Sequence, residues 1–185
     1  MPMRLHLDLA CRQLSVGGVI AYPTEAVWGL GCAPLNRHAF ERLIALKHRS
    51  LSKGVILIAA AFEPLEPFLA QISKSNLKPA LDSWPGPHTW LVPVASWVPG
   101  YLTGGRETLA VRVTGHPVAA ALCRAYGGPM VSTSANVSGR PPARSALQAR
   151  RMFGNKLDYI LPGDAGGLEK PTPIRELMTG KIVRP

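Results

Sequence analysis

Short unbroken runs of apolar residues alternate along this chain with segments in which apolar residues recur every three or four positions. Residues 19–22 and 55–59 are such runs, which is typical of strands buried on both faces of a sheet. The first run, ended by Pro23, is expected to be a central strand. Further strands are predicted at residues 89–94, 108–113 and 129–131, with short ones near Tyr159 and Ile182.

Helices are predicted where the apolar spacing lengthens. Leu5, Leu9 and Leu14 share one face of a first helix, which a pair of glycines ends. Asn36 is the expected N-cap of a second helix that ends at residues 47–49. The inward residues of that helix are Phe40, Leu43, Ile44 and Leu46. The remaining predictions are a loop at 24–31, two short helices within 63–83 with turns at Pro64, Pro67 and Pro79, and helices at 117–126 and 145–153.

The succession of strands and helices, without internal repeats or a dividing linker, predicts one α/β domain over residues 1–185. Its expected architecture is a twisted mixed β-sheet flanked by helices. A chain of 185 residues can bury a core without disulfides or metals, and 46% hydrophobic residues fit a folded globular protein.

The chain carries 21 lysines and arginines against 11 aspartates and glutamates, a formal net charge of +10. This excess favours polyanionic partners such as nucleic acid or nucleotides. A basic protein with no nucleic-acid role is the alternative that charge alone leaves open. Part of the excess forms either a patch for RNA or a solvated helix face: Arg140, Arg144, Arg150, Arg151 and Lys156.

The sequence disfavours several classes of protein. No apolar run is long enough to cross a bilayer, and the N-terminal segment lacks the apolar core of a signal peptide. Cys11, Cys32 and Cys123 form neither a disulfide frame nor a metal-ligand spacing, which favours the reducing cytoplasm. The histidines do not fall at zinc-ligand spacing, so no metal-binding residues are predicted. A Walker A loop and a dinucleotide-binding glycine motif are also missing.

The strongest candidate for a binding site is the segment 132–139, which places four hydroxyls and one carboxamide directly after a predicted strand. Small hydrogen-bonding side chains suit a polar ligand better than a core. Upstream, Lys47, Arg49 and Lys53 lie within seven residues at a helix end, which suggests a clamp for a triphosphate. The alternative is a solvated cluster that the helix dipole favours.

Other residues in these segments admit a structural role as well as a binding role. Ser134 and Asn136 either hold ribose, phosphate or a small substrate, or form a local hydrogen-bonded turn. Thr24 is either a ligand contact or the cap of a turn. Arg112 is either a partner for an anion or a salt-bridge residue.

Several of these segments, taken in order, resemble the motifs of the YrdC/Sua5 family, the threonylcarbamoyl-AMP synthases. Residues 22–31 resemble the opening PTE…YGLG motif of that family, residues 47–49 its KxR motif, and residues 132–139 its most recognisable segment. Further similar segments are residues 53–57, 84–89, 110–117 and 171–175. The likeness covers essentially the whole chain and is nearest to the short, single-domain bacterial form.

The resemblance implies a twisted α/β sheet with a concave, positively charged face. It also implies the condensation of L-threonine, bicarbonate or CO2, and ATP into threonylcarbamoyl-AMP and diphosphate. Lys47 and Arg49 are the implied catalytic cations. The implied ATP-binding residues are Lys47, Arg49, Lys53, Thr108, Ser134 and Asn136. The implied threonine-binding residues are Thr24, Arg112, Ser132 and Thr172.

This chain departs from the family pattern near the implied threonine site. Ala26 replaces a threonine that is frequent in the motif, and Trp28 replaces a tyrosine. Ile58 stands where long forms carry a histidine that approaches threonine. Recognition of threonine is therefore expected to depend on backbone groups, Arg112 and Thr172.

The partners that the resemblance implies are ATP with Mg2+, and downstream tRNA threonylcarbamoyl-transferase proteins that use the product to modify the adenosine beside the anticodon. Direct binding of tRNA or other RNA is a further expectation. The rival hypothesis is a non-enzymatic RNA-binding protein, acting in tRNA binding or ribosome assembly, which the charge of +10 supports equally well. The hydroxyl-rich segment favours the enzyme, because an RNA-binding module does not need such a pocket.

Overall fold

The computed structural model describes residues 3–170 and 172–184. Its strands are β1 (Ile20–Pro23), β2 (Trp28–Cys32), β3 (Ile56–Ala59), β4 (Thr89–Pro93), β5 (Thr108–Val113), β6 (Met130–Ser134), β7 (Tyr159–Ile160), β8 (Ile174–Glu176) and β9 (Ile182–Arg184). Its α-helices are α1 (Met3–Ser15), α2 (Arg37–Lys47), α3 (Lys74–Ser83), α4 (Gly100–Thr103), α5 (Pro117–Tyr126) and α6 (Ala146–Phe153).

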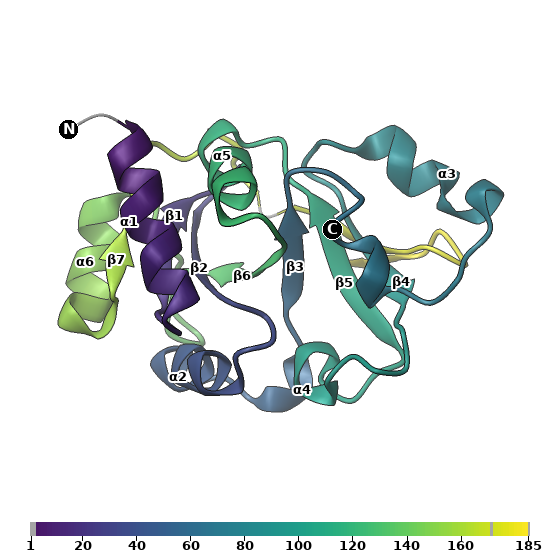
Figure 1. Ribbon diagram of the computed structural model, residues 1–185, viewed down its shortest axis with the longest axis horizontal. Helices are drawn as coiled ribbons and strands as arrows, with labels where there is room; N and C mark the ends of the chain where they lie inside the picture. Colours follow the sequence, from purple (N-terminus) through teal and green to yellow (C-terminus); the bar gives the residue numbers. More distant parts are fainter. Residues whose placement is uncertain (1–2, 171, 185) are drawn as a thin grey trace.

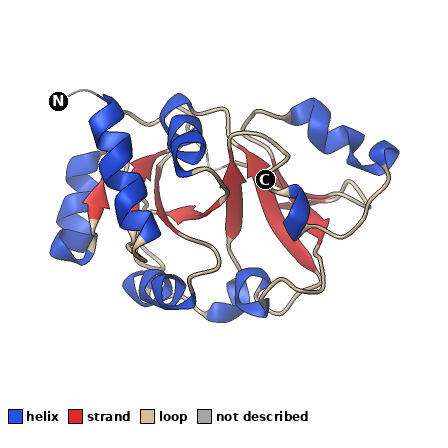
Figure 2. Ribbon diagram, viewed as in Figure 1, coloured by secondary structure: helices blue, strands red, loops and turns tan. Residues whose placement is uncertain are grey.

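Within the described residues the strands form one nine-stranded sheet in the order β7-β1-β2-β6-β3-β5-β4-β8-β9 (Figures 1 and 2). The pairs β1–β7, β3–β5 and β4–β8 are parallel, and the other neighbouring pairs are antiparallel. Helices flank this sheet. The predicted α/β class with a mixed sheet is therefore confirmed.

The register of five adjacent strands places two contrasting rows of residues side by side. The core row, one residue from each of β2, β6, β3, β5 and β4, consists of Cys32, Val131, Leu57, Val111 and Trp90. The cavity row, which lies one residue away from it on each strand, consists of Gly31, Ser132, Ile56, Ala110 and Leu91. Because successive residues of a strand point to opposite faces, the two rows belong to opposite faces of the sheet.

Helices cover the two faces unequally. The face of the core row packs against α2 and α6 through residues such as Phe40 and Phe153, which share its hydrophobic cluster. On the opposite face, α1 and α5 lie side by side (Figure 1) and cover the end of the sheet near β1, where Tyr22, Ile58 and Met130 form a second cluster. The cavity row lies beside this second cluster, and most of it lines a hollow described below.

Most predicted helices are confirmed. The side chain of Asn36 caps α2 by accepting a hydrogen bond from the N–H of Ala39 at 2.9 Å. Phe40, Leu43 and Ile44 are buried as expected, and Leu46 is half-buried. The helix predicted at 117–126 has the bounds of α5.

The loop predicted at residues 24–31 is confirmed for residues 24–27 and wrong for the rest, because residues 28–32 form β2. Gly29 and Gly31 suggested a loop in the sequence. In the structure neither has a positive φ, and both allow a close approach between strands. A Cβ on Gly31 would lie 2.7 Å from the carbonyl oxygen of Val131 and 2.8 Å from the ring of Tyr22. Only glycine fits between these groups.

Other boundaries also need correction. The strand predicted at 129–131 continues to Ser134, because Ser132 to Ser134 pair with β2. β1 is second from the sheet edge rather than central. In the segment 63–83 the first helix is only a short 3-10 turn at Glu66–Phe68, and Pro79 lies inside α3 instead of ending a helix. The short elements α4 and β8 were not predicted, and Pro171, which begins the last similar motif, lies outside the described residues.

No helix in the described ranges combines the length and the apolar character that a membrane crossing requires.

Candidate active site

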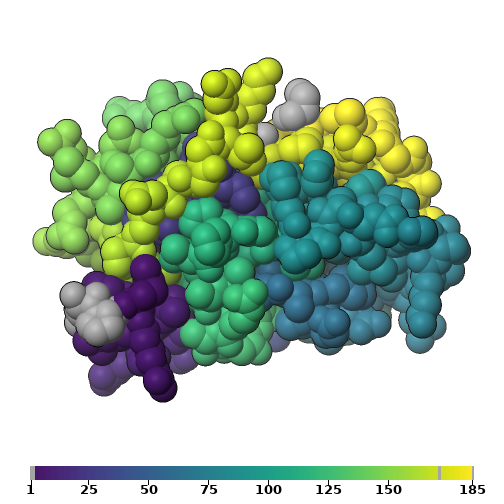
Figure 3. All heavy atoms as spheres, turned by 90° about the horizontal axis from the view of Figure 1, so that it is seen from above, coloured from purple at the N-terminus to yellow at the C-terminus, as the bar shows by residue number. Residues whose placement is uncertain are grey.

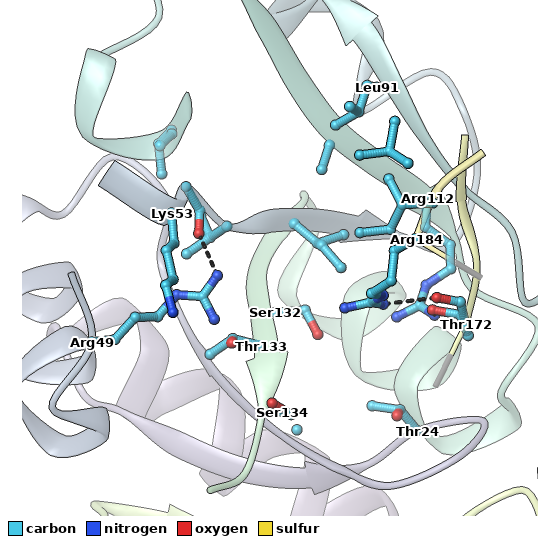
Figure 4. A pocket seen from close by; sticks show the side chains of 18 of the residues that line it. Thr24, Arg49, Lys53, Leu91, Arg112, Ser132, Thr133, Ser134, Thr172 and Arg184 are labelled. Atoms are coloured by element: carbon cyan, nitrogen blue, oxygen red, sulfur yellow. Dashed lines mark hydrogen bonds between the residues drawn. The ribbon is translucent and has the colours of Figure 1, made fainter. Parts of the chain in front are cut away.

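A cavity of about 460 Å³ opens over the cavity row (Figure 4). Its floor includes Ser132, Ile56, Ala110 and Leu91, one residue from each of four neighbouring strands. Eight residues of the predicted site line it, namely Thr24, Arg49, Lys53, Thr108, Arg112, Ser132, Ser134 and Thr172. The structure therefore brings together residues that lie up to 148 positions apart, from Thr24 to Thr172.

One end of the cavity carries Arg49, Lys53 and Arg106. α2 ends in a Schellman motif, in which His48 adopts a left-handed conformation with φ 48° and Arg49 N–H donates to the carbonyl of Ile44 at 3.2 Å. This turn follows Lys47, which is buried in the last turn of α2, and precedes Arg49, which lines the cavity. The Nη2 of Arg49 then donates to the carbonyl of Gly54 at 3.0 Å, which fixes the guanidinium at the cavity wall.

The opposite end carries Arg112, Arg184 and Thr172 (Figure 4). Arg112 is 4% exposed, and its Nη1 donates to Thr172 Oγ1 at 2.8 Å. The Nη2 of Arg184 donates to the carbonyl of Thr172 at 2.7 Å. The Nε of Arg112 is buried and has no hydrogen-bond partner in the described structure.

The cations of the cavity repel one another. Burial and the charge of Arg106 lower the pKa of Arg49 below its ordinary value. Burial and the charges of Arg112 and Arg49 lower the pKa of Arg184 in the same way. Among the described residues, those that line the cavity include four arginines and one lysine but no carboxylate. A bound anion would relieve this repulsion at either end.

Hydroxyl groups lie between the two cationic ends, on the strand that carries Ser132, Thr133 and Ser134 (Figure 4). Ser134 donates its hydroxyl to Asn136 Oδ1 at 2.6 Å. Thr24 lies at the rim, and its hydroxyl donates to the carbonyl of Val27 at 2.6 Å, so it caps the turn between β1 and β2 as well as lining the cavity.

Lys47 and Asn136 do not line the cavity. Lys47 is 1% exposed, and its Nζ donates to the carbonyl oxygens of Ser134 and Asn136 and to Asn136 Oδ1. The carboxamide nitrogen of Asn136 donates to the carbonyls of Val137 and Arg140. Both side chains thus hold the turn that follows β6, and the direct ATP contacts expected of them stay a prediction.

Two cavity cations were missed from the sequence. Arg106 follows the short helix α4, and Arg184 lies on the last strand, β9. A strand was expected near Ile182, so the basic residue at its end was the available signal for Arg184. Arg106 offered no such signal, because neither α4 nor its packing against the loop after α2 was predicted.

The departures from the family pattern have clear positions. Ile58 is fully buried under α1 and α5 and does not line the cavity. Its register partner on β5 is Arg112, which does line the cavity. Ala26 and Trp28 are also part of the lining.

Mg2+ is held in proteins by oxygen ligands, above all carboxylates. In the part of the chain that the structure describes, no three His, Cys, Asp or Glu side chains come together. The lining residues supply hydroxyls and cations instead of carboxylates. These side chains do not fit a Mg2+ ion held by the protein.

The fold and the cavity define an α/β protein with a cavity on one face of its sheet that carries cationic side chains at both ends. A family model named Sua5_yciO_yrdC, described as "Telomere recombination", matches residues 12–185. The chain belongs to this family, which confirms the resemblance found in the sequence.

Curated relatives match over most of the chain. The threonylcarbamoyl-AMP synthase of Halorhodospira halophila is 54% identical over 175 residues, covering 95% of this chain and 92% of that protein. The threonylcarbamoyl-AMP synthase of Cellvibrio japonicus is 51% identical over 180 residues, covering 97% of this chain and 95% of that protein.

Solved structures agree in fold. The crystal structure of P. abyssi Sua5 complexed with L-threonine matches with a TM-score of 0.91 and 30% identity, covering all of this chain and 55% of that chain. The chain thus spans about half the length of that protein. The crystal structure of E. coli YciO matches with a TM-score of 0.85 and 26% identity, covering 99% of this chain and 89% of that chain.

Proposed function

We propose that this protein is a nucleotidyltransferase that condenses L-threonine, bicarbonate or CO2, and ATP into threonylcarbamoyl-AMP and diphosphate. The observation that carries the proposal is the cavity with a cationic group at each end, in a chain about half identical to proteins named for this activity. Threonine and ATP each bring a negative group, so one reactant fits each end. The product would serve the threonylcarbamoyl modification of adenosine in tRNA.

The end with Arg112 and Thr172 suits the carboxylate of threonine. Arg112 lines this end of the cavity, and a guanidinium can offer a carboxylate two parallel N–H donors. The related Sua5 structure is described as a complex with L-threonine. Thr24 and Ser132 lie on the same lining and would contact the rest of the amino acid.

The end with Arg49, Lys53 and Arg106 suits the triphosphate of ATP. Three cations converge there. The charge of Arg106 contributes to the lowered pKa of Arg49. Thr108 and Ser134 line the same hollow and would hold the nucleotide through hydroxyls.

The reaction then requires alignment more than covalent help from the protein. The amine of threonine adds to CO2, which bicarbonate supplies by losing hydroxide, and the amine proton is released to give a carbamate. A carbamate oxygen attacks the α-phosphorus of ATP, and the bond from that phosphorus to the diphosphate breaks. Holding the reactants between two cationic ends fixes the line of attack and stabilises the charge on departing diphosphate.

The test is a product assay with each substrate omitted in turn. Purified protein, ATP, L-threonine and 13C-bicarbonate should give diphosphate and an adenylate whose mass contains threonine, AMP and the labelled carbon. Omitting threonine or bicarbonate should abolish both products. Diphosphate release that is independent of threonine, or no labelled adenylate at all, would overturn the proposal.

RNA binding stays a separate prediction. The basic residues expected to form an RNA patch are exposed on and around α6: Arg140, Arg144, Arg150, Arg151 and Lys156. This exposure fits an RNA surface and a solvated helix face equally. A thermal-shift comparison separates the hypotheses, because a synthase should be stabilised by ATP with threonine in raised salt, where binding of RNA weakens.

A further inference from the structure

Glu25 lies beneath the Arg112 end of the cavity. It is 7% exposed and, among the residues that the structure describes, it is the acidic side chain that is buried. Its Oε1 accepts hydrogen bonds from the hydroxyl of Thr114 at 2.7 Å and from the N–H of Gly115 at 3.2 Å. A carboxylate is costly to bury, so these contacts explain how it is tolerated but not what it does there.

The other oxygen of Glu25 faces Arg112. Oε2 lies 3.5 Å from Arg112 Nη1, and both side chains are under 10% exposed. Oε2 has no hydrogen-bond partner, and Nη1 gives its hydrogen bond to Thr172 instead. The pair therefore attracts through charge at close range and leaves the remaining N–H groups of Arg112 available.

The backbone around Glu25 is also fixed. Its carbonyl accepts from the N–H of Leu168 at 3.1 Å, and the carbonyl of Thr24 accepts from Gly166 at 2.9 Å. A Cβ on Gly166 would lie 2.9 Å from the carbonyl oxygen of Glu25, so the two segments are in close contact. The segment 161–168, yellow-green in Figure 3, runs over the surface beside the green atoms of α5. Glu25 is thus held from the backbone side and from the carboxylate side.

We propose that Glu25 is a positioning residue that holds the guanidinium of Arg112 in the orientation that receives the carboxylate of threonine. The inference rests on the proposed function, and it names a residue that does not line the cavity. Without the charge of Oε2, the guanidinium keeps only its bond to Thr172, and rotation about that one bond would turn its free donors away. Glu25 touches no substrate in this arrangement, so its effect passes entirely through Arg112.

The decisive experiment compares Glu25→Gln with the wild-type protein in the product assay. The amide keeps an oxygen for Thr114 and Gly115 but removes the negative charge opposite Arg112. The KM for threonine should rise about tenfold, while the KM for ATP and kcat change less than about twofold. Glu63→Gln, the same change at an exposed carboxylate, is the matched control and should leave all three constants unchanged.

Coupling to Arg112 separates positioning from a general effect on the fold. In an Arg112→Lys background, Glu25→Gln should add less than about twofold to the KM for threonine, because the partner it orients is already gone. A full tenfold increase in both backgrounds would overturn the proposal, as would an equal loss in kcat and both KM values. A wild-type protein that makes no labelled adenylate refutes the proposed function instead.

A second variant decides the matter if Glu25→Gln does not fold. Thr114→Val removes the hydroxyl that fixes Oε1 and keeps the volume and the charge of Glu25. It should raise the KM for threonine about threefold with kcat retained, and Thr114→Ser should restore the wild-type value. An unchanged KM in Thr114→Val would overturn the proposal.

Discussion

The core row and the cavity row are one residue apart on the same strands, yet one packs in the hydrophobic core and most of the other lines the cavity. Val131 and Leu57 of the core row are fully buried in the main hydrophobic cluster, whereas their neighbours Ser132 and Ile56 form part of the cavity floor. The strands cross both environments without any change in backbone. Alternation with a period of two therefore lets a four- or five-residue strand supply stability with one face and ligand contacts with the other.

The contrast between the rows predicts where a substitution should affect stability and where it should affect ligand binding. Substitution in the core row removes buried apolar contacts but no ligand contact. Substitution of a polar residue that lines the cavity removes a group that can contact a ligand. Neighbouring residues on β6 thus offer an internal comparison, since both occupy one strand and both are buried.

The largest effect on the cavity side is expected from Arg49→Ala. Its guanidinium donates one hydrogen bond to the protein, to the carbonyl of Gly54, and the side chain lines the cavity. Loss of one preorganised cation should reduce kcat/KM for ATP by about a hundredfold or more. The melting temperature should change little, because no buried apolar contact is lost.

The control for Arg49→Ala is Arg150→Ala, which removes an exposed arginine from α6. Its turnover in the threonine- and bicarbonate-dependent diphosphate assay should match that of the wild type. Normal turnover of Arg49→Ala would refute the clamp and would mean that the cavity row does not floor the ATP site.

The converse effect is expected from Val131→Ser in the core row. Val131 is fully buried, and its register partners Cys32 and Leu57 are too. The substitution leaves a void and an unpaired hydroxyl, so the free energy of unfolding should fall by about 2–4 kcal/mol in a urea titration. The KM values of the folded enzyme should stay near those of the wild type. A stable Val131→Ser protein with altered KM values would mean that the two faces are not separate.

A smaller effect is expected one residue along, at Ser132→Ala. Ser132 is 3% exposed and lines the cavity. Removing the hydroxyl that we propose contacts threonine should raise the KM for threonine by up to about tenfold, at a cost in stability below about 1 kcal/mol. Thr133→Ala, which changes the next residue of β6, is a useful companion variant. If Ser132→Ala behaves like Val131→Ser, in stability and not in KM, the contrast between the rows fails.

The sequence predicts the core row better than the cavity row. Unbroken apolar runs such as 55–59 mark strands because burial requires apolar side chains on every strand that crosses the core. The run does not show that Ile56 lines a cavity while Leu57 is core, since both are apolar. Only the pairing of β3 with β5 and β6 distinguishes them.

The candidate site was predictable to the extent that its residues lie in motifs. The hydroxyls of β6 and the cations after α2 are local signals, and eight of the predicted residues do meet in one cavity. The burial of Lys47 was not predictable, because it depends on contacts with Ser134 and Asn136, which lie far along the chain. Glu25 and Arg184 acquire their roles from long-range contacts, across 87 and 12 positions to Arg112 and Thr172 respectively, which no local pattern encodes.

Lys47 combines features of the two environments. It is buried, as the residues of the core row are, and it carries a polar group, as many residues around the cavity do. Burial lowers its pKa to about 7, and the charge of Arg49 adds to the shift. Three oxygen acceptors from Ser134 and Asn136 surround its Nζ and act in the opposite direction. The lowered pKa predicts that removing the ammonium proton favours the folded state.

The expected pH dependence of stability follows from the number of protons that the folded and the unfolded states bind. An unfolded lysine has a pKa of about 10.4, so between pH 7 and 8.5 the unfolded chain holds a proton that folded Lys47 has released. Stability of the wild type should then rise with pH in this window, by on the order of 1 kcal/mol per unit, relative to Lys47→Met. The buried thiols of Cys32 and Cys123, whose pKa values burial raises to about 12, are common to both proteins and cancel in the difference.

The measurement is the free energy of unfolding in urea at several pH values for the wild type, Lys47→Met and Lys74→Met, a control at an exposed lysine. The profile of the control should run parallel to that of the wild type. Parallel profiles for Lys47→Met as well would show that the three oxygens keep the ammonium charged. Lys47 would then be a permanent cation behind the cavity floor, and its charge would add to that of the cations that line the cavity.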